Sequence, residues 1–445
     1  MNAPILVIDF GTTTSAASVV VDDDAWLVTE PASGGFLWPS AVCWDGQQLL
    51  VGTLADRRKR TDPTTYWAEF KRGLAVDTPV LLGHRWFRPS ELVVTVLSAL
   101  KAEAQRQLGA VIDRAVLTVP ASYVHGDPRR ARMTAAAEAA GFVAVELVPE
   151  PAAAAFASDS GQHGGELVLV YDLGGGTFDA ALVRLGETWH EVLGHAALDD
   201  CGGRDIDALL SSRIRHESDQ WLTPLRNSMA ATPSAPASLR LSMAIADFAQ
   251  RIKHQLTDVQ VAQDFLMPNT PMYQLARPEF AHLTAPHIGR TIACCTDLLA
   301  RLGVPLSEVS SVLLAGGSSR MPIIAERLER ELGRPLRRIP EPDLAVVRGA
   351  ARWLQRSGSR VIQAARIPAR TVPLAFPIPG GSGRLLRWHV LPGETYAEGS
   401  RLARVRLPNG ALWDLTAAAP GMIDRFLVQP GRDVDATDWL ALARH

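Results

Sequence analysis

The sequence predicts an α/β protein of two related halves, followed by a small all-β domain. The first indication is an internal repeat, because residues 6–14 (LVIDFGTTT) share their pattern with residues 169–177 (LVYDLGGGT). The second is that helical stretches separate strand-like apolar runs, which lie at residues 5–8, 115–119, 167–170 and 312–315. The third is a shorter repeat near the C-terminus, where residues 387–393 match residues 425–431 with a period of 38.

Each copy of the long repeat predicts a buried strand that ends in an aspartate, Asp9 or Asp172, before a turn rich in glycine and threonine. Such a turn directs backbone N–H groups into a concavity, and its small residues let a phosphate approach. The aspartate can hold the hydrated Mg²⁺ that accompanies a polyphosphate. The pattern continues past the turn, since Val20 matches Val183. Two such hairpins facing each other would bind one nucleotide from both sides.

The composition fits a chain of two or three domains with large apolar cores, because 47% of its 445 residues are hydrophobic. No apolar run is long enough to span a bilayer, and the first residues lead directly into a predicted strand. We therefore expect a cytoplasmic protein without membrane contact. The net charge of −2 gives no reason to expect nucleic acid as a partner.

The chain is rich in arginine and has only four lysines, which are Lys59, Lys71, Lys101 and Lys253. Because arginine replaces almost every other cation, we expect the remaining lysines to be needed for their compact ammonium groups. The four cysteines show no metal-ligand spacing, and we expect them to be buried, reduced thiols.

Two helices have clear predicted boundaries. Asp127 and Pro128 predict a helix that ends at Gly141, and Pro322 predicts another that ends at Gly333. Residues rich in Pro, Ser and Ala then predict a loop or frayed helix at 223–240, and a segment rich in Pro, Gly and Arg predicts a linker at 357–383.

A series of short motifs surrounds the two repeats. In chain order they are DFGTTT at 9–14, FKR at 70–72, VLTVPA at 116–121, EPAAAA at 150–155, DLGGGTFD at 172–179, GGRDID at 202–207, QRIKHQLT at 250–257, LAGGSSRMP at 314–322 and EPD at 341–343. With these motifs, residues 1–355 resemble the ATPase domain of the 70-kDa heat-shock protein (DnaK-type) family, within the actin-like ATPase superfamily.

The resemblance implies a two-lobed actin-like ATPase fold of duplicated ribonuclease H-like domains. Lobe I is then expected at residues 1–165, completed by residues 343–356, and lobe II at residues 166–342. Residues 384–445 resemble a biotinyl/lipoyl-type hammerhead domain, whose cofactor is carried on a lysine between its halves. No lysine lies in this part of the sequence, so a docking or structural module is expected instead of a carrier.

The resemblance also implies roles for individual residues in ATP hydrolysis. Asp9 would orient Mg²⁺ through water, and Asp172 would lie near both Mg²⁺ and the nucleophilic water as a catalytic residue. Lys71 would meet the γ-phosphate and the attacking water. Glu150 would be a second carboxylate near that water, and Thr177 would contact the γ-phosphate. Charge stabilisation and positioning are most of what phosphoryl transfer requires.

Other residues would hold ATP or ADP by the same resemblance. The phosphate loops would contribute Gly11, Thr12, Thr13, Gly174, Gly175 and Gly176, with Gly202 and Gly203 packed beside them. The adenosine side would comprise Gln250, Lys253, Thr257, Gly316, Gly317, Ser318, Arg320 and Asp343. Two positions depart from the family pattern, since Gln250 stands where Glu is usual and Glu341 stands where Asn is usual.

These observations favour a chaperone-like, ATP-hydrolysing switch that lacks the family's usual peptide-binding domain and helical lid. A protein partner or client would then bind through the C-terminal β domain. Three alternatives remain open from the sequence: a nucleotide-dependent scaffold that does not hydrolyse ATP, a sugar kinase of the same superfamily, and an actin-like polymer former.

Overall fold

The computed structural model describes residues 3–59, 61–123, 126–157, 165–186, 190–220, 222–223, 237–267, 270–357, 371–392, 394–436 and 438–444. Most of the chain up to residue 359 forms one compact unit, and residues 360–445, with residues 124–130, are grouped as a second unit. Within the part described, no helix is both long and apolar enough to cross a bilayer. Most of the segment expected to be a loop or frayed helix at 223–240 lies outside the described residues.

Lobe I of the larger unit is built on a mixed sheet. Its strands are β1 (Ile5–Phe10), β2 (Thr14–Val21), β3 (Asp24–Leu27), β4 (Trp38–Pro39), β10 (Arg114–Val119) and β11 (Ala144–Pro149). The order is β11-β10-β1-β2-β3, in which β10 lies parallel to β1 and β2 lies antiparallel to it. The central strand β1 is almost wholly apolar and buried because both faces of the sheet are covered.

Lobe II repeats the order of the five strands on the main path of this sheet. Its sheet contains β12 (Leu167–Leu173), β13 (Phe178–Leu185), β14 (His190–Leu198), β17 (Val309–Ala315) and β18 (Leu336–Arg338). The order β14-β13-β12-β17-β18 again has a central strand with an antiparallel hairpin partner on one side and a parallel strand on the other. The two repeated segments of the sequence therefore occupy equivalent positions, at β1-β2 and at β12-β13.

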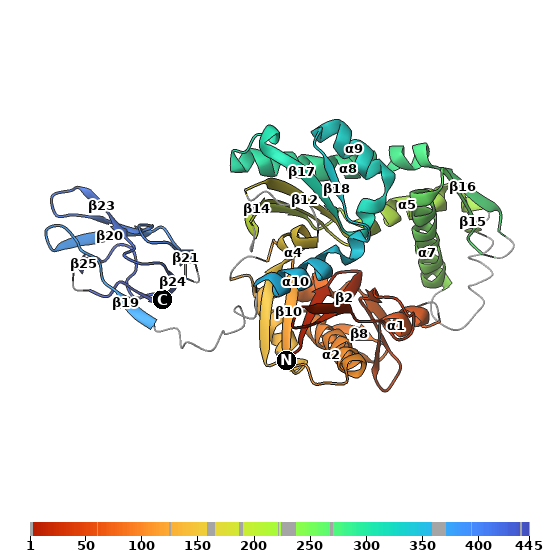
Figure 1. Cartoon of the computed structure of the whole chain (residues 1–445), viewed down its shortest axis with the longest axis horizontal. Coiled ribbons are helices and arrows are strands. Elements are labelled where there is room, and N and C mark those ends of the chain that lie inside the picture. The colour runs from red at the N-terminus through yellow and green to blue at the C-terminus, as the bar shows by residue number, and fades with distance from the viewer. Residues whose placement is uncertain are drawn as a thin grey trace. The chain divides into compact units, whose positions relative to one another are not determined.

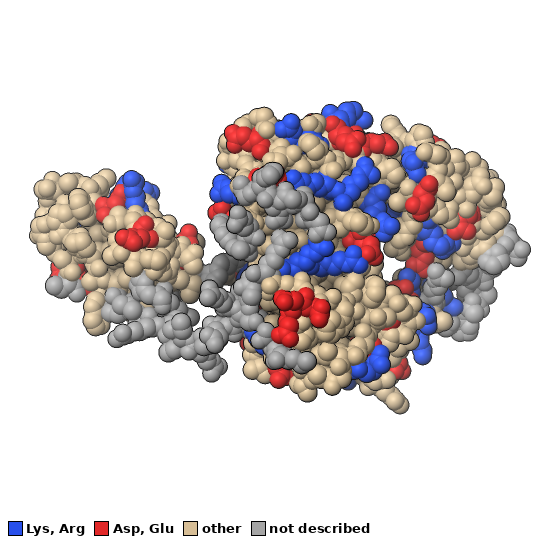
Figure 2. All heavy atoms as spheres, viewed as in Figure 1, with Lys and Arg blue, Asp and Glu red and all other residues tan. Residues whose placement is uncertain are grey.

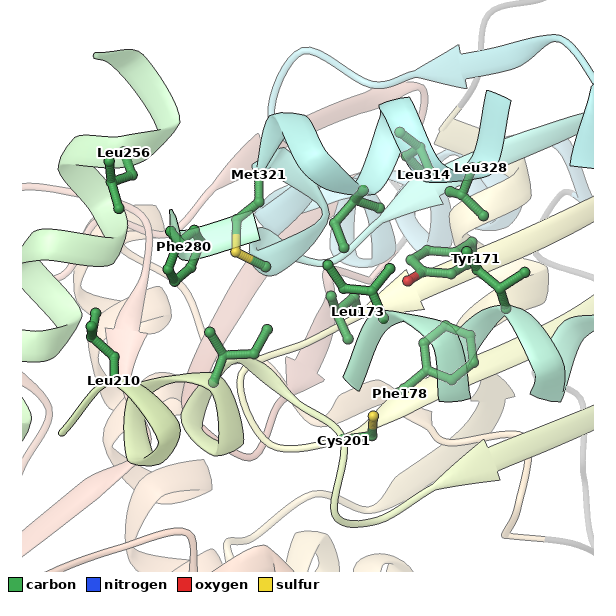
Figure 3. Close-up of a cluster of buried hydrophobic side chains, with 14 of the residues drawn as sticks. Tyr171, Leu173, Phe178, Cys201, Leu210, Leu256, Phe280, Leu314, Met321 and Leu328 are labelled. Atoms are coloured by element: carbon green, nitrogen blue, oxygen red, sulfur yellow. The ribbon is translucent and has the colours of Figure 1, made fainter. Parts of the chain in front are cut away.

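Helices cover the sheets of both lobes. In lobe I they are α2 (Pro89–Leu108) and α3 (Pro128–Ala139), and in lobe II they are α5 (Gly203–Glu217), α7 (Ala237–Asp258), α8 (Arg277–Leu302) and α9 (Pro322–Leu332). The expected helix boundaries are found, because α3 begins at Pro128 and α9 begins at Pro322. Figure 3 shows the core of lobe II, where Tyr171 and Phe178 of the sheet pack among side chains from the surrounding helices.

Two helices connect the lobes by crossing over between them (Figure 1). α4 (Glu150–Ala157) follows the last strand of lobe I but packs on β12, β13 and β14 of lobe II. α10 (Ala345–Ser357) follows lobe II but packs on β1, β2 and β10 of lobe I. The helices approach closely because Gly349 has no side chain, and a Cβ there would overlap the Ala153 carbonyl of α4.

Smaller elements extend the outer parts of both lobes. In lobe I they are β5 (Ala41–Trp44), β6 (Leu49–Val51), α1 (Thr53–Arg58), β7 (Tyr66–Ala68), η1 (Phe70–Ala75), β8 (Val80–Leu82) and β9 (Arg85–Phe87); in lobe II they are β15 (Val261–Phe265), β16 (Met272–Ala276), η2 (Leu306–Glu308), η3 (Gly317–Arg320) and η4 (Pro342–Leu344). Lys and Arg side chains on the face of the larger unit drawn in Figure 2 are interspersed with Asp and Glu, in keeping with the small net charge.

The C-terminal unit is a sandwich of two four-stranded sheets with its own core. Its strands are β19 (Thr371–Leu374), β20 (Ser382–Trp388), β21 (Thr395–Tyr396), β22 (Arg401–Arg406), β23 (Leu412–Thr416), β24 (Gly421–Phe426), β25 (Asp433–Asp435) and β26 (Ala441–Arg444). The sheets have the orders β19-β26-β24-β21 and β23-β22-β20-β25, so each contains strands from both copies of the short repeat.

The two copies are related by an internal twofold. A bulge interrupts the β20–β22 pairing between Leu385 and Arg387, and the β24–β26 pairing is interrupted 38 positions later, between Ile423 and Arg425. Trp388 and Phe426, also 38 positions apart, stack on each other with ring centroids at 4.2 Å. The short repeat seen in the sequence is therefore a structural repeat.

The C-terminal unit begins earlier than the expected boundary at residue 384. β19 pairs with β26, and Phe376 and Ile378 are buried in the same core, so the second half of the segment expected to be a linker is part of the sandwich. β19 is the first strand of the first repeat copy. The remainder of the expected linker lies mostly outside the described residues.

Candidate functional site

The turns that follow β1 and β12 meet face to face between the lobes. A Cβ at Gly175 would overlap the Thr13 side chain, and a Cβ at Gly176 would lie 2.6 Å from Cγ2 of Thr12. The two loops are therefore in van der Waals contact, and only glycine fits at these positions of the second loop. The expectation that the repeated loops face each other is consistent with this geometry.

The first loop is held by a residue that sequence reasoning missed. The Ser40 amide donates to the Thr13 carbonyl and its hydroxyl donates to the Gly11 carbonyl, both at 2.8 Å. Its hydroxyl also lies 2.8 Å from that of Ser15. Thr13 Oγ1 is buried and has no hydrogen-bond partner among the described residues. It is a polar group that a ligand between the loops would satisfy.

The second loop rests on the turn at residues 202–205. The Gly203 amide donates to the Gly174 carbonyl at 2.9 Å, and the Arg204 amide donates to the Gly175 carbonyl at 2.8 Å. A Cβ at Gly202 would overlap the backbone of Gly176, so this turn also requires glycine. The structure places Gly202 and Gly203 beside the second loop.

A buried lysine lies beside the first loop. Lys71, in η1, has a side chain only 5% exposed, and its Nζ donates to the Phe10 carbonyl at 2.5 Å and to Glu150 Oε1 at 3.1 Å. Glu150 is the first residue of α4. The structure thus brings together Lys71 and Glu150, two of the expected catalytic residues that are far apart in the sequence.

Carboxylates gather around this lysine. Burial first and the charge of Glu150 second raise the pKa of Asp9 to about 7 and that of Asp179 to about 7. Burial also raises the pKa of Asp172 well above its usual range, with contributions from Glu150, Asp179 and Asp9. The pKa of Lys71 is raised: burial alone would lower it, but the charge of Glu150 leads the opposing effects. These carboxylates are near enough to repel one another, so a cation would be stabilised among them.

Two further contacts shape this cluster. Thr118 Oγ1 donates to Asp9 at 2.8 Å, and Thr177 Oγ1 donates to Asp179 at 3.1 Å. Asp179 is the last residue of the DLGGGTFD motif at 172–179 but was not among the expected site residues. Among the described residues, no group of three or more His, Cys, Asp and Glu is arranged to bind a metal directly. The donors present fit an ion held through its own water molecules, as Mg²⁺ commonly is beside phosphates.

The expected adenosine residues form the opposite side of the site. Lys253 of α7 is buried; its Nζ lies 2.9 Å from Asp207 Oδ2 and 3.0 Å from the Gly203 carbonyl. A Cβ at Gly203 would overlap Ser318 Oγ, so the turn at 316–320 touches the turn at 202–205. Lys253 therefore forms a structural ion pair that joins α7 to α5 and to the turn at 202–205. Asp207 was not among the expected site residues.

The turn at 316–320 reaches both Asp172 and Asp343. A Cβ at Gly316 would overlap the Asp172 carboxylate, and a Cβ at Gly317 would overlap the Asp343 carboxylate. Arg320 Nη1 donates to Asp343 at 3.2 Å, and more than half of the Arg320 side chain is exposed.

Gln250 and Thr257 lie on α7 about one turn to either side of Lys253. Both are partly buried, and neither side chain makes a hydrogen bond within the described part of the chain. The structure places them on the expected helix but does not join them to the loops.

Arginines bridge the lobes beside the loops. Arg72 donates to the Gly176 carbonyl and lies 3.3 Å from Glu69, which also pairs with Arg204. Sequence reasoning singled out Lys71 but not its neighbour Arg72, and nothing in the pattern marked Glu69.

All four lysines have specific partners. Lys59 Nζ lies 3.1 Å from Asp56 and 3.0 Å from Asp247, and Lys101 Nζ donates to the Gly141 carbonyl and lies over the Phe142 ring. Lys71 and Lys253 have the buried partners described above. The scarcity of lysine therefore marks positions where a compact ammonium has a defined contact.

The family model described as Hsp70 protein matches residues 75–355, which is more than half of the chain. The matched range contains the second loop, the turn at 202–205, α7 and the turn at 316–320. The first loop and Lys71 precede it, so their place in the site depends on the structural equivalence of the two lobes and on the contacts given above.

Proposed function

The chain belongs to the Hsp70 family, and on that basis we propose that it is a molecular switch that binds ATP or ADP with Mg²⁺ and hydrolyses ATP slowly. The observation that carries this proposal is the contact between two equivalent loops, with a buried lysine and a cluster of carboxylates beside them. Such a site provides small residues for the phosphates, a cation for the terminal phosphate and acids for a metal.

Each side chain has a task in this proposal. Asp9 and Asp172 would hold the ion through its water molecules, and Mg²⁺ when bound supplies neutralisation of phosphate charge. Lys71 would stabilise charge on the γ-phosphate, and Glu150 would orient the attacking water. The free hydroxyl of Thr13 and the hydroxyl of Thr177 would donate to phosphate oxygens.

The nucleoside would lie on the side of the turn at 316–320. Gly316 and Gly317 would let the adenosine approach the backbone, and Arg320 would lie beside the base. Lys253 would act through its ion pair with Asp207, which holds α7 against α5 and the turn at 202–205. This differs from a direct contact with ribose, because both partners are already buried and paired with one another.

The test compares nucleotide binding with phosphate release in the same purified protein. We expect calorimetric heat on titration with Mg·ATP, slow release of phosphate, and a lower rate in Thr177→Ala with binding retained. Absence of binding by both Mg·ATP and Mg·ADP would refute the nucleotide site. Tight binding without phosphate release would favour a non-hydrolysing, nucleotide-dependent scaffold, which the close contact of the loops also fits.

We further propose that the C-terminal unit takes the place of the family's peptide-binding domain and transmits the switch to a protein partner. Support comes from its internal twofold and self-contained core, which indicate an independent module. Affinity capture with and without ATP, comparing the full chain with a version ending near residue 357, would show whether partner binding needs this unit.

A further inference from the structure

One face of the C-terminal sandwich carries an unusual concentration of arginine. The sheet β23-β22-β20-β25 turns its buried residues, such as Leu385 and Val405, toward the core. Its other face carries five arginines, which we call the arginine face: Arg384, Arg387, Arg401, Arg404 and Arg406. Four of the five are exposed, and Arg404 is partly buried.

The pairing of the strands places these like charges opposite one another. Arg384 lies opposite Arg406, and Arg387 lies opposite Arg404, on the neighbouring strands β20 and β22. Like charges directly opposite each other destabilise an antiparallel pair. The face therefore carries an electrostatic cost that a bound anion would remove.

Among the described residues, one carboxylate forms ion pairs with this face, and it offsets only part of the charge. Asp414 of β23 pairs with Arg404 at 2.6 and 2.9 Å, and Arg401 lies 3.6 Å from it. Arg384, Arg387 and Arg406 have no carboxylate within 4.0 Å in the described part of the chain. The one side-chain hydrogen bond found among these three runs from Arg384 to the Gly431 carbonyl at 3.0 Å.

The fold itself does not require arginine at three of these five positions. In the second copy of the repeat, 38 positions later, Arg384, Arg401 and Arg404 are replaced by Met422, Trp439 and Leu442. The other two positions keep arginine, as Arg425 and Arg444. The strand register is the same in both copies, since Arg425 lies opposite Leu442 as Arg387 lies opposite Arg404. At three positions the second sheet thus has an apolar residue where the first has arginine, so the excess of arginine on the first sheet points to recognition.

We propose that the arginine face binds an acidic segment of a partner protein in extended conformation. Arg404 and Arg406 are two residues apart on β22, so their side chains are separated by about 7 Å along the strand. Acidic residues at alternate positions of an extended peptide have the same spacing. Arginine also pairs with carboxylates through two parallel hydrogen bonds, which suits a sheet without lysine.

The borders of the face favour a peptide over a nucleic acid. Asp414 lies on β23 at one side, and Asp433, which pairs in register with Arg384, lies on β25 at the other. These carboxylates confine the positive charge to a strip two strands wide. A single extended peptide matches such a strip, whereas the continuous charge of a phosphate backbone would be repelled at its edges.

The test measures binding of a fluorescent peptide to the full-length protein at low and high salt. The probe alternates Glu with Thr, and the comparison peptide has Gln in place of Glu. We expect the Glu peptide to bind at low salt, to weaken as salt is added, and to bind about tenfold more weakly to the double variant Arg384→Met, Arg387→Gln. Arg425→Gln, at the repeat position of Arg387 on the other sheet, is the matched control and should bind like the wild type.

Three results would overturn the proposal: equal binding of the Glu and Gln peptides, equal binding by the double variant and the wild type, or preferred binding of a single-stranded oligonucleotide at the same salt. Thermal unfolding checks that the variants are folded, and Arg384→Met should not lower the melting temperature because it relieves a repulsive pair. Arg406→Gln on its own repeats the comparison if the double variant does not fold.

Discussion

Replacing Lys71 by Met tests the catalytic part of the site most directly. The ammonium is buried, 3.1 Å from Glu150 and 2.5 Å from the Phe10 carbonyl, so it is a charge held in a fixed position beside the first loop. Loss of one preorganised charge that stabilises a transition state costs about 10²- to 10³-fold in rate, or ~2.7–4 kcal/mol. We expect Lys71→Met to lower the rate of ATP hydrolysis by this factor while the affinity for Mg·ADP changes less than tenfold.

The assay is single-turnover phosphate release, with nucleotide binding measured separately by calorimetry. Lys101→Met is the matched control, because the contacts of Lys101 among the described residues, with the Gly141 carbonyl and the Phe142 ring, lie within lobe I. The buried pair also contributes to folding, and breaking such a pair costs about 3–5 kcal/mol, so thermal unfolding accompanies each measurement. A folded Lys71→Met protein that hydrolyses ATP within threefold of the wild-type rate would refute the reasoning.

Three further predictions concern the loops, the carboxylates and the C-terminal unit. Gly175→Ala places a methyl group where the Thr13 side chain lies, so it should separate the two loops. Calorimetry should then show Mg·ATP binding weakened at least about tenfold, and unchanged binding would contradict the loop contact. The pKa of Asp9 is raised to about 7, so the folded state binds its proton more tightly than the unfolded chain. The unfolding free energy without nucleotide should therefore fall as pH rises from about 4 through about 7, by up to about 4 kcal/mol. Urea unfolding should show a shallower fall in Asp9→Asn, and an equal slope in the variant and the wild type would contradict the assignment of this pH dependence to Asp9. Trp388→Ala removes one ring of the stacked pair on the internal twofold and should destabilise the C-terminal unit by about 3 kcal/mol. Trp439 is 62% exposed, so Trp439→Ala should change the unfolding midpoint of this unit little. Similar losses of stability in both variants would argue against a contribution from the stacking.

The architecture of the larger unit could be predicted because its defining signals are local. The two aspartate-ended strands have a continuous apolar pattern, and each turn needs small residues for steric reasons, as Gly175 shows against Thr13. The boundaries at Pro128 and Pro322 follow from the fixed backbone of proline. A repeat in sequence therefore became a repeat in topology.

The contacts that complete the site could not be predicted because they are long-range and use common residue types. Ser40 stabilises the first loop from the bend between β4 and β5, more than twenty residues away, and a serine after a proline carries no distinctive pattern. Arg72 and Glu69 act across the lobes, so their partners exist only once both halves have folded. β19 was missed because its Pro373 and the arginine-rich flanks resemble a linker, although the strand pairs with the end of the chain.

The exchange of α4 and α10 between the lobes has a consequence for dividing the chain. A cut in the segment 158–164 would give two fragments, each with a helix whose apolar side belongs on the other's sheet. Neither should be soluble alone, but the pair should reassemble when coexpressed, which makes this connection a natural position for a split-reporter design. Because α4 of the first half packs on lobe II and α10 of the second half packs on lobe I, a rotation of one lobe must also move a helix that belongs to the other half of the chain.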